Sequence, residues 1–277
     1  MSLPTRVLVK SAEMLAFALC KRRNRAAVRS IHAAFTAFRY RFENVNFNFN
    51  TNGERRLLER LALTKPLIIF DVGANTGDYA LLVSQLCADA TIHAFEPLPS
   101  TFEILKKRLA DTPTVQLNNF GLGASEQVVP LHHRGGGDVT ASAFPLESDS
   151  QREAPAQVTS VRIVRGDDYL KSVALPKVDF LKIDVEGMEY EVMKGFGGFL
   201  ASSVDCVQFE YGVFNIVSHH LLRDICGLLS AQGYSVGKVF PRFVEFFDYN
   251  PTREDFLGNN FVAVRRERKD LIKLVAR

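Results

Sequence analysis

The sequence has no tryptophan and few cysteines. Its four cysteines, Cys20, Cys87, Cys206 and Cys226, lie far apart, without a Cys-x-x-Cys pair or a histidine at zinc-ligand spacing. This spacing disfavours both a disulfide framework and a structural zinc site, and it favours a reducing compartment. We therefore expect a cytoplasmic protein.

Long apolar runs are absent as well. The run from Leu15 to Cys20 is far shorter than the roughly 20 residues that span a bilayer. A secretory signal is not indicated, because charged residues follow this run and no small-residue cleavage site is evident. The sequence thus predicts a soluble protein.

Negative charge is scarce near the N-terminus. Glu13 is the single acidic residue among the first 41, which hold nine cations: Arg6, Lys10, Lys21, Arg22, Arg23, Arg25, Arg29, Arg39 and Arg41. A solvated helical face is the simpler interpretation; the alternative is peripheral contact with the anionic inner face of a membrane. We expect no nucleic-acid partner, because no aromatic and basic RNA-binding block is present.

The chain is long enough for one α/β domain with an appendage. Its first 43 residues predict one or two helices, and the turn-rich stretch up to Gly53 predicts a boundary. We expect a helical extension over residues 1–53, a catalytic domain over 54–265 and a charged tail over 266–277. The oligomeric state is left open.

Short apolar runs then alternate with helical patterns. Strands are predicted at 67–70, 91–95, 114–120, 178–183 and 204–209, and helices at 54–63, 78–87 and 99–109. This alternation is typical of a mostly parallel, doubly wound sheet. Between Gly121 and Gly166 a long glycine-containing connection predicts a mobile segment over the site, with an additional strand at 158–164.

The most informative segment runs from Asp71 to Gly77 and joins the first buried strand to a helix. Gly73 and Gly77 allow a sharp turn and a close approach to a ligand at the carboxyl edge of the sheet. Glu96 ends the next strand, where a carboxylate can accept hydrogen bonds from both ribose hydroxyls. An adenosine-containing ligand is therefore predicted.

The spacing of this loop distinguishes between adenosine ligands. Dinucleotide sites use Gly-x-Gly-x-x-Gly, whereas this loop reads Asp-x-Gly-x-x-x-Gly. The carboxylate of Asp71 would repel a pyrophosphate but suits the ammonium group of a methionine-like tail. We expect S-adenosylmethionine, contacted by Asp71, Gly73, Ala74, Asn75, Gly77, Tyr79, Phe95, Glu96, Pro97, Asn119, Gly121 and Asp184.

Carboxylates are dense after the fourth predicted strand. Asp184 ends that strand, Glu186 follows, and Glu210 ends the neighbouring strand. Methyl transfer to oxygen needs an aligned hydroxyl and a group that takes its proton, so these three are the predicted catalytic residues. Helix capping is the structural alternative, and a divalent metal held by oxygen ligands is not favoured.

Several further side chains have two interpretations. Lys182 shares a face with Asp184 and is expected to balance its charge. Glu189 could simply lie on an exposed helix face. His132 and His133 beside the glycines, and His219 and His220 before a helix, are candidates for a general base or a pocket wall, but surface positions are commoner.

Three blocks of the chain resemble the FkbM family of methyltransferases. They are Phe70 to Gly77, Ala94 to Pro97 and Leu181 to Glu189, and the third is the most distinctive. The resemblance covers about residues 52–265. It implies a Rossmann-like class I methyltransferase fold with a seven-stranded, mostly parallel sheet. It also implies S-adenosylmethionine as donor and O-methylation of sugars, glycolipid or polysaccharide precursors, or small natural products.

Two other classes remain as alternatives. A NAD(P)-dependent oxidoreductase on a similar fold would bind NADH instead of the adenosyl ligands. A non-catalytic adenosyl-binding protein would bind the ligand, yet Asp184→Asn would change no activity.

Overall fold

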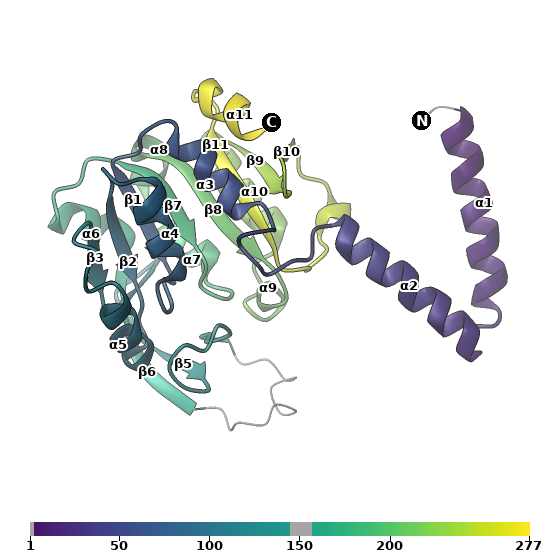
Figure 1. Cartoon of the computed structure of the whole chain (residues 1–277), viewed down its shortest axis with the longest axis horizontal. Coiled ribbons are helices and arrows are strands. Elements are labelled where there is room, and N and C mark those ends of the chain that lie inside the picture. Colours follow the sequence, from purple (N-terminus) through teal and green to yellow (C-terminus); the bar gives the residue numbers. More distant parts are fainter. Residues whose placement is uncertain (1–2, 145–156) are drawn as a thin grey trace. The chain divides into compact units, whose positions relative to one another are not determined.

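The computed structural model describes residues 3–144 and 157–277 (Figure 1). The chain forms two compact units, one ending at Val45 and the other running from Asn46 to Arg277. The division therefore precedes the boundary expected at residue 53. The reason is that residues 46–53 pack against the rest of the second unit. The backbone of Gly53 lies so close to Phe240 that a Cβ atom on residue 53 would be only 2.3 Å from the carbonyl oxygen of Phe240.

The first unit consists of two helices, as the sequence predicts. They are α1 (Leu3–Cys20) and α2 (Ala26–Phe42), joined by a turn that contains Arg22 and Arg23. In the described parts of the chain, no helix has the length and apolar character needed to cross a membrane.

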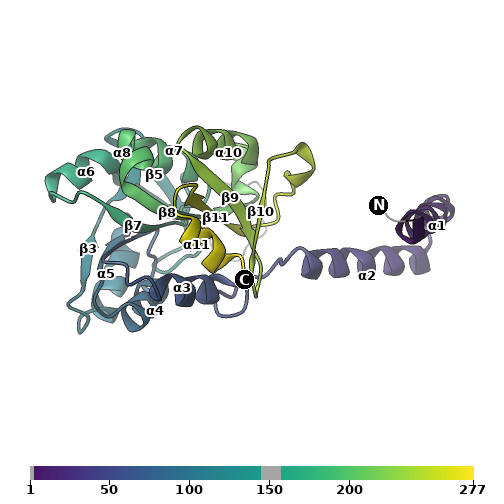
Figure 2. The ribbon, with the colours of Figure 1, turned by 90° about the horizontal axis from the view of Figure 1, so that it is seen from above.

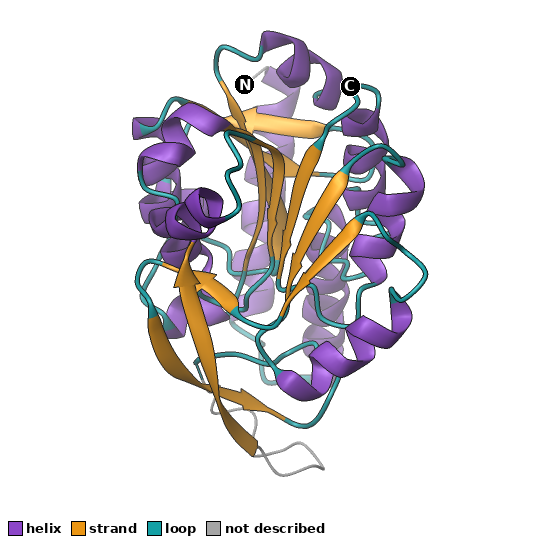
Figure 3. Ribbon diagram, turned by 90° about the vertical axis from the view of Figure 1, so that its left-hand side faces the viewer, coloured by secondary structure: helices purple, strands orange, loops and turns teal. Residues whose placement is uncertain are grey.

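The second unit is built on an eight-stranded sheet (Figure 3). Its order is β10-β9-β11-β8-β7-β1-β2-β3. The bounds are β1 (Ile68–Val72), β2 (Thr91–Phe95), β3 (Val115–Asn118), β7 (Val178–Ile183), β8 (Val204–Tyr211), β9 (Tyr234–Val239), β10 (Val244–Phe247) and β11 (Asn259–Arg265).

The neighbouring strands β3, β2, β1, β7 and β8 pair in parallel, in that order. Strand β11 is antiparallel to both of its neighbours, β8 and β9. This arrangement confirms the mostly parallel, Rossmann-like α/β fold. The sheet has one strand more than the seven expected, because β10 adds an antiparallel partner to β9.

Helices cover both faces of this sheet (Figure 2). One layer holds α3 (Glu54–Ala62), α4 (Asp78–Leu86), α5 (Pro99–Arg108) and α11 (Lys269–Val275); the other holds α6 (Gly166–Ser172), α7 (Glu189–Gly195), α8 (Gly198–Ser203) and α10 (Leu222–Ala231). Burial on both faces explains why apolar residues predominate in the central strands.

The C-terminal segment is not a separate tail. Leu271 and Val275 of α11 are each 3% exposed and pack with Leu57, Leu58 and Leu61 of α3. The expected boundary at residue 265 is therefore corrected: the apolar face of α11 completes the core of the second unit.

A smaller sheet occupies the long connection. It contains β4 (Gly121–Gly123), β5 (Gln127–His133) and β6 (Gln157–Arg165), in the order β4-β6-β5. The strand predicted at 158–164 is confirmed within β6. Of the polar stretch predicted as part of a mobile segment, residues 147–156 lie outside the described residues.

Candidate functional site

A cavity of about 810 Å³ lies at the carboxyl edge of the main sheet. Its walls include the residues that follow β1, β2, β7 and β8, as well as residues of the smaller sheet. The carboxyl edge is where open α/β sheets bind their ligands. The cavity therefore coincides with the predicted cofactor and catalytic positions.

The glycine loop forms one wall of this cavity. The amides of Gly73 and Ala74 both donate to the carbonyl oxygen of Phe95, at 3.0 and 2.9 Å, which fixes the loop against β2. Gly73 has φ +85°, and a Cβ atom there would lie 1.8 Å from the carbonyl oxygen of Asp184. Only glycine fits here, because the ends of β1 and β7 approach so closely.

Glu96 lies on the cavity wall beside this loop. One carboxylate oxygen accepts from the amide of Asn75 at 3.0 Å and the other from the amide of Leu98 at 2.8 Å. Burial raises the pKa of Glu96 to about 7. Each carboxylate oxygen has a second lone pair. The side chain is thus held rigidly, with capacity left to accept hydrogen bonds from ribose hydroxyls.

Lys182 is buried at the base of the cavity, with two carboxylates beside it. Asp71 and Lys182 are register partners in the β1–β7 pair, and Lys182 Nζ lies 2.7 Å from Asp184 Oδ2. Burial opposes the charge on Lys182, but the nearby carboxylates outweigh it and raise its pKa. The expected balancing of Asp184 by Lys182 is confirmed.

Asp71 is fully buried, and its carboxylate oxygens accept no hydrogen bond from the described residues. Burial raises the pKa of Asp71 to about 6, against the attraction of Lys182. Asp71 lies outside the cavity wall, and its charge acts on two residues of that wall, Lys182 and Glu96.

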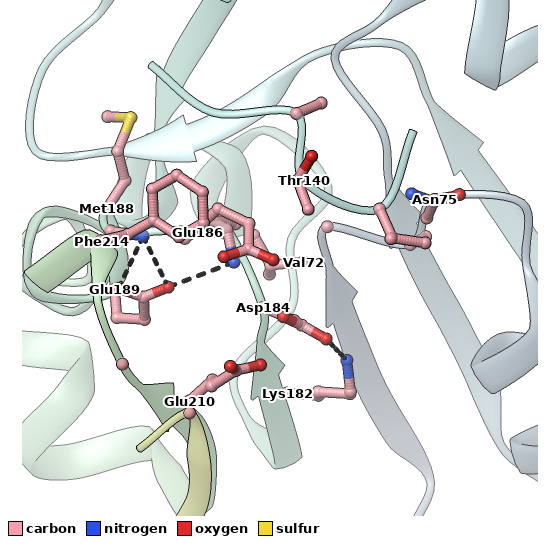
Figure 4. Close-up of a pocket in the computed structure, with 18 of the residues that line it drawn as sticks. Val72, Asn75, Thr140, Lys182, Asp184, Glu186, Met188, Glu189, Glu210 and Phe214 are labelled. Carbon is pink, nitrogen blue, oxygen red and sulfur yellow. Dashed lines mark hydrogen bonds and ion pairs between the residues drawn. The ribbon is translucent and has the colours of Figure 1, made fainter. Parts of the chain in front are cut away.

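Three carboxylates converge on the same space (Figure 4). Asp184 comes from the end of β7, Glu186 from the next turn and Glu210 from β8. Burial and then the neighbouring acids raise the pKa of Glu186 to about 9 and that of Glu210 well above its ordinary range. All three groups can orient a hydroxyl, and Asp184, which pairs with Lys182, can accept its proton.

Glu189 does not lie on an exposed helix face, which is one interpretation of the sequence. It is 2% exposed and lines the cavity, and its carboxylate accepts from the amides of Val185 and Gly187 at 3.3 and 3.1 Å. Burial raises the pKa of Glu189 to about 7. These bonds hold the turn that presents Glu186, whose φ is +50°.

The far end of the cavity is formed by segments distant in sequence. Phe47, Phe49 and Glu54 from the start of the second unit face the wall formed by Phe256 to Gly258. The amide of Gln208 donates to Glu54 at 2.7 Å and to Asn260 at 2.8 Å. Aromatic rings and carboxamide or carboxylate groups therefore surround this end, which no local motif indicates.

The described part of the long connection closes the cavity on another side. Asp138, Val139, Thr140 and Ala141 line it, and the amide side chain of Asn75 donates to the carbonyl oxygen of Asp138 at 3.1 Å. The carboxylate of Asp138 accepts from the amides of Arg134 and Thr140. This segment lies over the glycine loop, as predicted.

The structure brings most predicted site residues together. The cavity is lined by Gly73, Ala74, Asn75, Tyr79, Glu96, Pro97, Gly121, Asp184, Glu186 and Glu210. Tyr79 also lies beneath Lys182, with Nζ 4.7 Å from the ring centroid.

Three predicted cofactor contacts, in addition to Asp71, lie outside the wall. A Cβ on Gly77 would meet Leu105 at 2.7 Å, so this glycine serves the packing of α4 on α5. Phe95 is a core residue packed on Phe70, and the Asn119 amide donates to the carbonyl oxygen of Glu96 at 2.9 Å. These residues support the loops that reach the cavity.

The candidate histidines do not line the cavity. His133 is buried, with Nε2 2.9 Å from the Thr159 hydroxyl and Nδ1 accepting from the Gly135 amide. His220 stacks on Tyr190 with ring centroids 4.3 Å apart. Within residues 3–144 and 157–277, no group of three or more acidic, histidine or cysteine side chains is arranged to hold a metal ion.

Comparison with known proteins gives a family match. The family described as "Methyltransferase FkbM domain" matches residues 71–236. The chain is 31% identical over 137 residues to the hexuronic acid methyltransferase AglP of Haloferax volcanii, covering 49% of this chain and 52% of that protein. It is 26% identical over 203 residues to the 2-O-methyltransferase NoeI of Sinorhizobium fredii, covering 69% and 81%.

The match to AglP thus spans about half the length of that relative. Among solved structures, the methyltransferase FkbM of Methylobacillus flagellatus has a TM-score of 0.46 and 15% identity, covering 72% of this chain and 44% of that one. The family match includes the glycine loop, Glu96 and all three converging carboxylates, and it spans more than half of the chain. The protein belongs to the FkbM family of methyltransferases.

Proposed function

We propose that this protein transfers a methyl group from S-adenosylmethionine to a hydroxyl of a sugar or another polyhydroxylated small molecule. The observation that carries this proposal is the convergence of Asp184, Glu186 and Glu210 on a cavity that the glycine loop and Glu96 also line. One end suits an adenosyl group and the other suits a hydroxyl acceptor.

The cofactor end fits S-adenosylmethionine in chemistry as well as in position. Glu96 retains lone pairs for a ribose, and the acidic residues around Asp184 favour a cationic ligand over a pyrophosphate. When bound, the cofactor supplies an electrophilic methyl group. The protein's own contribution is to bind it, exclude water and place a hydroxyl in line.

The acceptor end supports a hydroxylated ligand. Glu54, Glu210 and Asn260 offer oxygen and amide groups, while Phe47 and Phe256 offer apolar faces. We assign the acceptor hydroxyl to the space beside Asp184 and Glu210. Asp184 takes the proton of the hydroxyl, and Glu210, whose pKa is raised by burial, helps to orient it. The names of AglP and NoeI, which refer to a hexuronic acid and to 2-O-methylation, agree with this acceptor class.

The proposal is tested with methyl-labelled S-adenosylmethionine and a panel of neutral mono- and oligosaccharides. At saturating cofactor, Asp184→Asn should lower turnover by about 100-fold, because the amide keeps the shape but takes up no proton. Asp111→Asn, at an exposed position, is the matched control. Labelled product from the wild type, with full activity in Asp184→Asn, would reject the catalytic assignment.

A further inference from the structure

We propose that the first unit is a docking surface for an anionic lipid membrane, with α2 lying along the membrane interface. The cavity and its chemistry leave these helices without a role. The inference stands apart from the proposed enzymatic activity, because it depends only on residues of α1, α2 and the turn between them.

The first observation is an uninterrupted apolar stripe on α2. Val28, Ile31, Phe35, Phe38 and Phe42 recur at spacings of three and four residues, which places them on one face of the helix. Three of the rings are widely exposed, at 62% for Phe35, 68% for Phe38 and 71% for Phe42, and no residue of α2 is buried. A contiguous exposed stripe of this kind marks an interaction surface.

The second observation is the charge that surrounds this stripe. The unit contains the nine cations named above, against Glu13 and Glu43, and α2 itself has no acidic residue. At 100° per residue, Arg39 and Arg41 lie on opposite flanks of the apolar face. Arginine side chains in such positions extend their charges to the headgroup level while the apolar face enters the interface.

Helix α1 adds apolar surface of the same kind. Its exposed large side chains include Leu8, Met14, Leu15 and Phe17, and Lys21 lies over the Phe17 ring at 4.5 Å. The helix also carries Arg6, Lys10 and Glu13, and it does not qualify as a membrane span. An apolar helix with interspersed cations fits a position in the interface rather than across the bilayer.

A second copy of the chain fits the apolar stripe of α2 less well than an anionic membrane does. In a parallel pair Arg39 and Arg41 would lie close to the same arginines of the partner, and in either orientation they would meet a helix without acidic residues. At 17 residues, α2 also falls short of the three to four heptads that identify a coiled coil. A nucleic acid would use the cations but leave the phenylalanines exposed to water. An anionic bilayer accommodates both features.

The test is flotation of the full chain with phosphatidylcholine vesicles, prepared with and without phosphatidylglycerol. We expect binding to the anionic vesicles alone, weakened by salt. The double changes Phe35→Ser with Phe38→Ser and Arg39→Glu with Arg41→Glu should each reduce binding by roughly tenfold or more. The matched control is Lys106→Glu with Lys107→Glu, two exposed cations of α5, which should leave binding unchanged.

Three outcomes would overturn the proposal. One is a wild-type chain that floats with neither type of vesicle, which would show that it does not bind them. Another is binding that the arginine changes abolish but the phenylalanine changes leave intact, which would indicate a general polyanion surface. The third is a concentration-dependent dimer in sedimentation that the phenylalanine changes dissolve, without vesicle binding. Unchanged melting temperatures of the variants would show that the second unit remains folded.

Discussion

Single residues determine how charge is distributed in the cavity. Lys182 is the one cation among the described residues of its wall, and Asp184 pairs with it at 2.7 Å. Around Glu186 lie Asp184, Glu189, Asp138 and Lys182, and the net effect, with burial the largest part, is a pKa of about 9. At neutral pH this carboxyl group is therefore protonated in the ligand-free protein.

A proton should consequently leave the cavity when a cationic ligand binds. A sulfonium favours the ionised form of Glu186, so the affinity for S-adenosylmethionine should rise with pH up to about 9. S-adenosylhomocysteine lacks the sulfonium, and its affinity should rise less. Calorimetric titrations between pH 6.5 and 9 measure how the affinity for each ligand changes with pH. In Glu186→Gln the two ligands should show nearly the same pH dependence. Equal slopes for the two ligands would contradict this coupling.

Three other buried carboxyl groups make the stability of the ligand-free protein depend on pH. The pKa values of Asp71, Glu96 and Glu189 are raised to about 6, 7 and 7, mainly by burial. A carboxyl group whose pKa is raised on folding contributes stability that is complete below its unfolded pKa and is lost as pH rises through the folded value. Ligand-free protein should lose this contribution between about pH 4 and 7, and a cationic ligand should restore part of it.

Among the elements, the segments before α3 and before β11 give the acceptor end its shape. Gly258, with φ +68°, lies where a Cβ atom would be 2.9 Å from the Phe47 ring and 3.1 Å from Glu210 Oε1. Glycine is required here by both the backbone conformation and the space. The two segments are thus fitted to each other around Glu210.

Replacing this glycine should disturb the acceptor end selectively. Gly258→Ala should raise the KM for the acceptor several-fold, since Phe47 or Glu210 must move, while cofactor affinity stays nearly unchanged. Gly227→Ala in α10 is the matched control, because its Cβ would meet nothing within 4 Å. Steady-state kinetics with each substrate varied in turn measures the effect; equal losses for cofactor and acceptor would show a general defect.

The elements also show what local sequence can and cannot predict. The bounds of β2 and β7 agree with the sequence prediction to the residue, because both are short buried runs between clear turn or helix signals. Strand β5 was not predicted, since its residues 127–130 are largely exposed and lack a regular alternation. Strand β10 is only four residues long and is held by its pairing with β9.

The same contrast holds for the site. Glycines and carboxylates at the ends of strands could be placed from the sequence, because parallel strands bring their carboxyl ends to one edge. Glu54 and Asn260 could not, since they reach the cavity through a bond network in which Gln208 and Glu54 are 154 residues apart. The segment from Asn46 to Gly53 is predicted only as a boundary. It contributes residues to the cavity wall because the fold brings it close to segments that are distant in sequence.

For the whole molecule, the balance of charge in the cavity predicts the charge of the acceptor. The described wall holds carboxyl groups, among them Glu54 and Asp184, against a single cation, Lys182, which is already paired with Asp184. A hexuronate would find no unpaired cation in the described wall for its carboxylate. Neutral hexosides should therefore be methylated at least several-fold faster, in kcat/KM, than the matched hexuronates. Competition between a glucoside and the corresponding glucuronide measures this ratio, and preference for the glucuronide would contradict it.

Calorimetric titration with S-adenosylmethionine, S-adenosylhomocysteine and NADH tests the identity of the cofactor most directly. We expect both adenosyl ligands to bind with a Kd of the order of micromolar and NADH not to bind. Glu96→Ala should weaken the adenosyl ligands by roughly tenfold or more, through loss of charged hydrogen bonds to the ribose. Glu103→Ala, at an exposed position of α5, should bind normally. Binding of NADH alone, or near-normal affinity in Glu96→Ala, would contradict the assignment of this cavity.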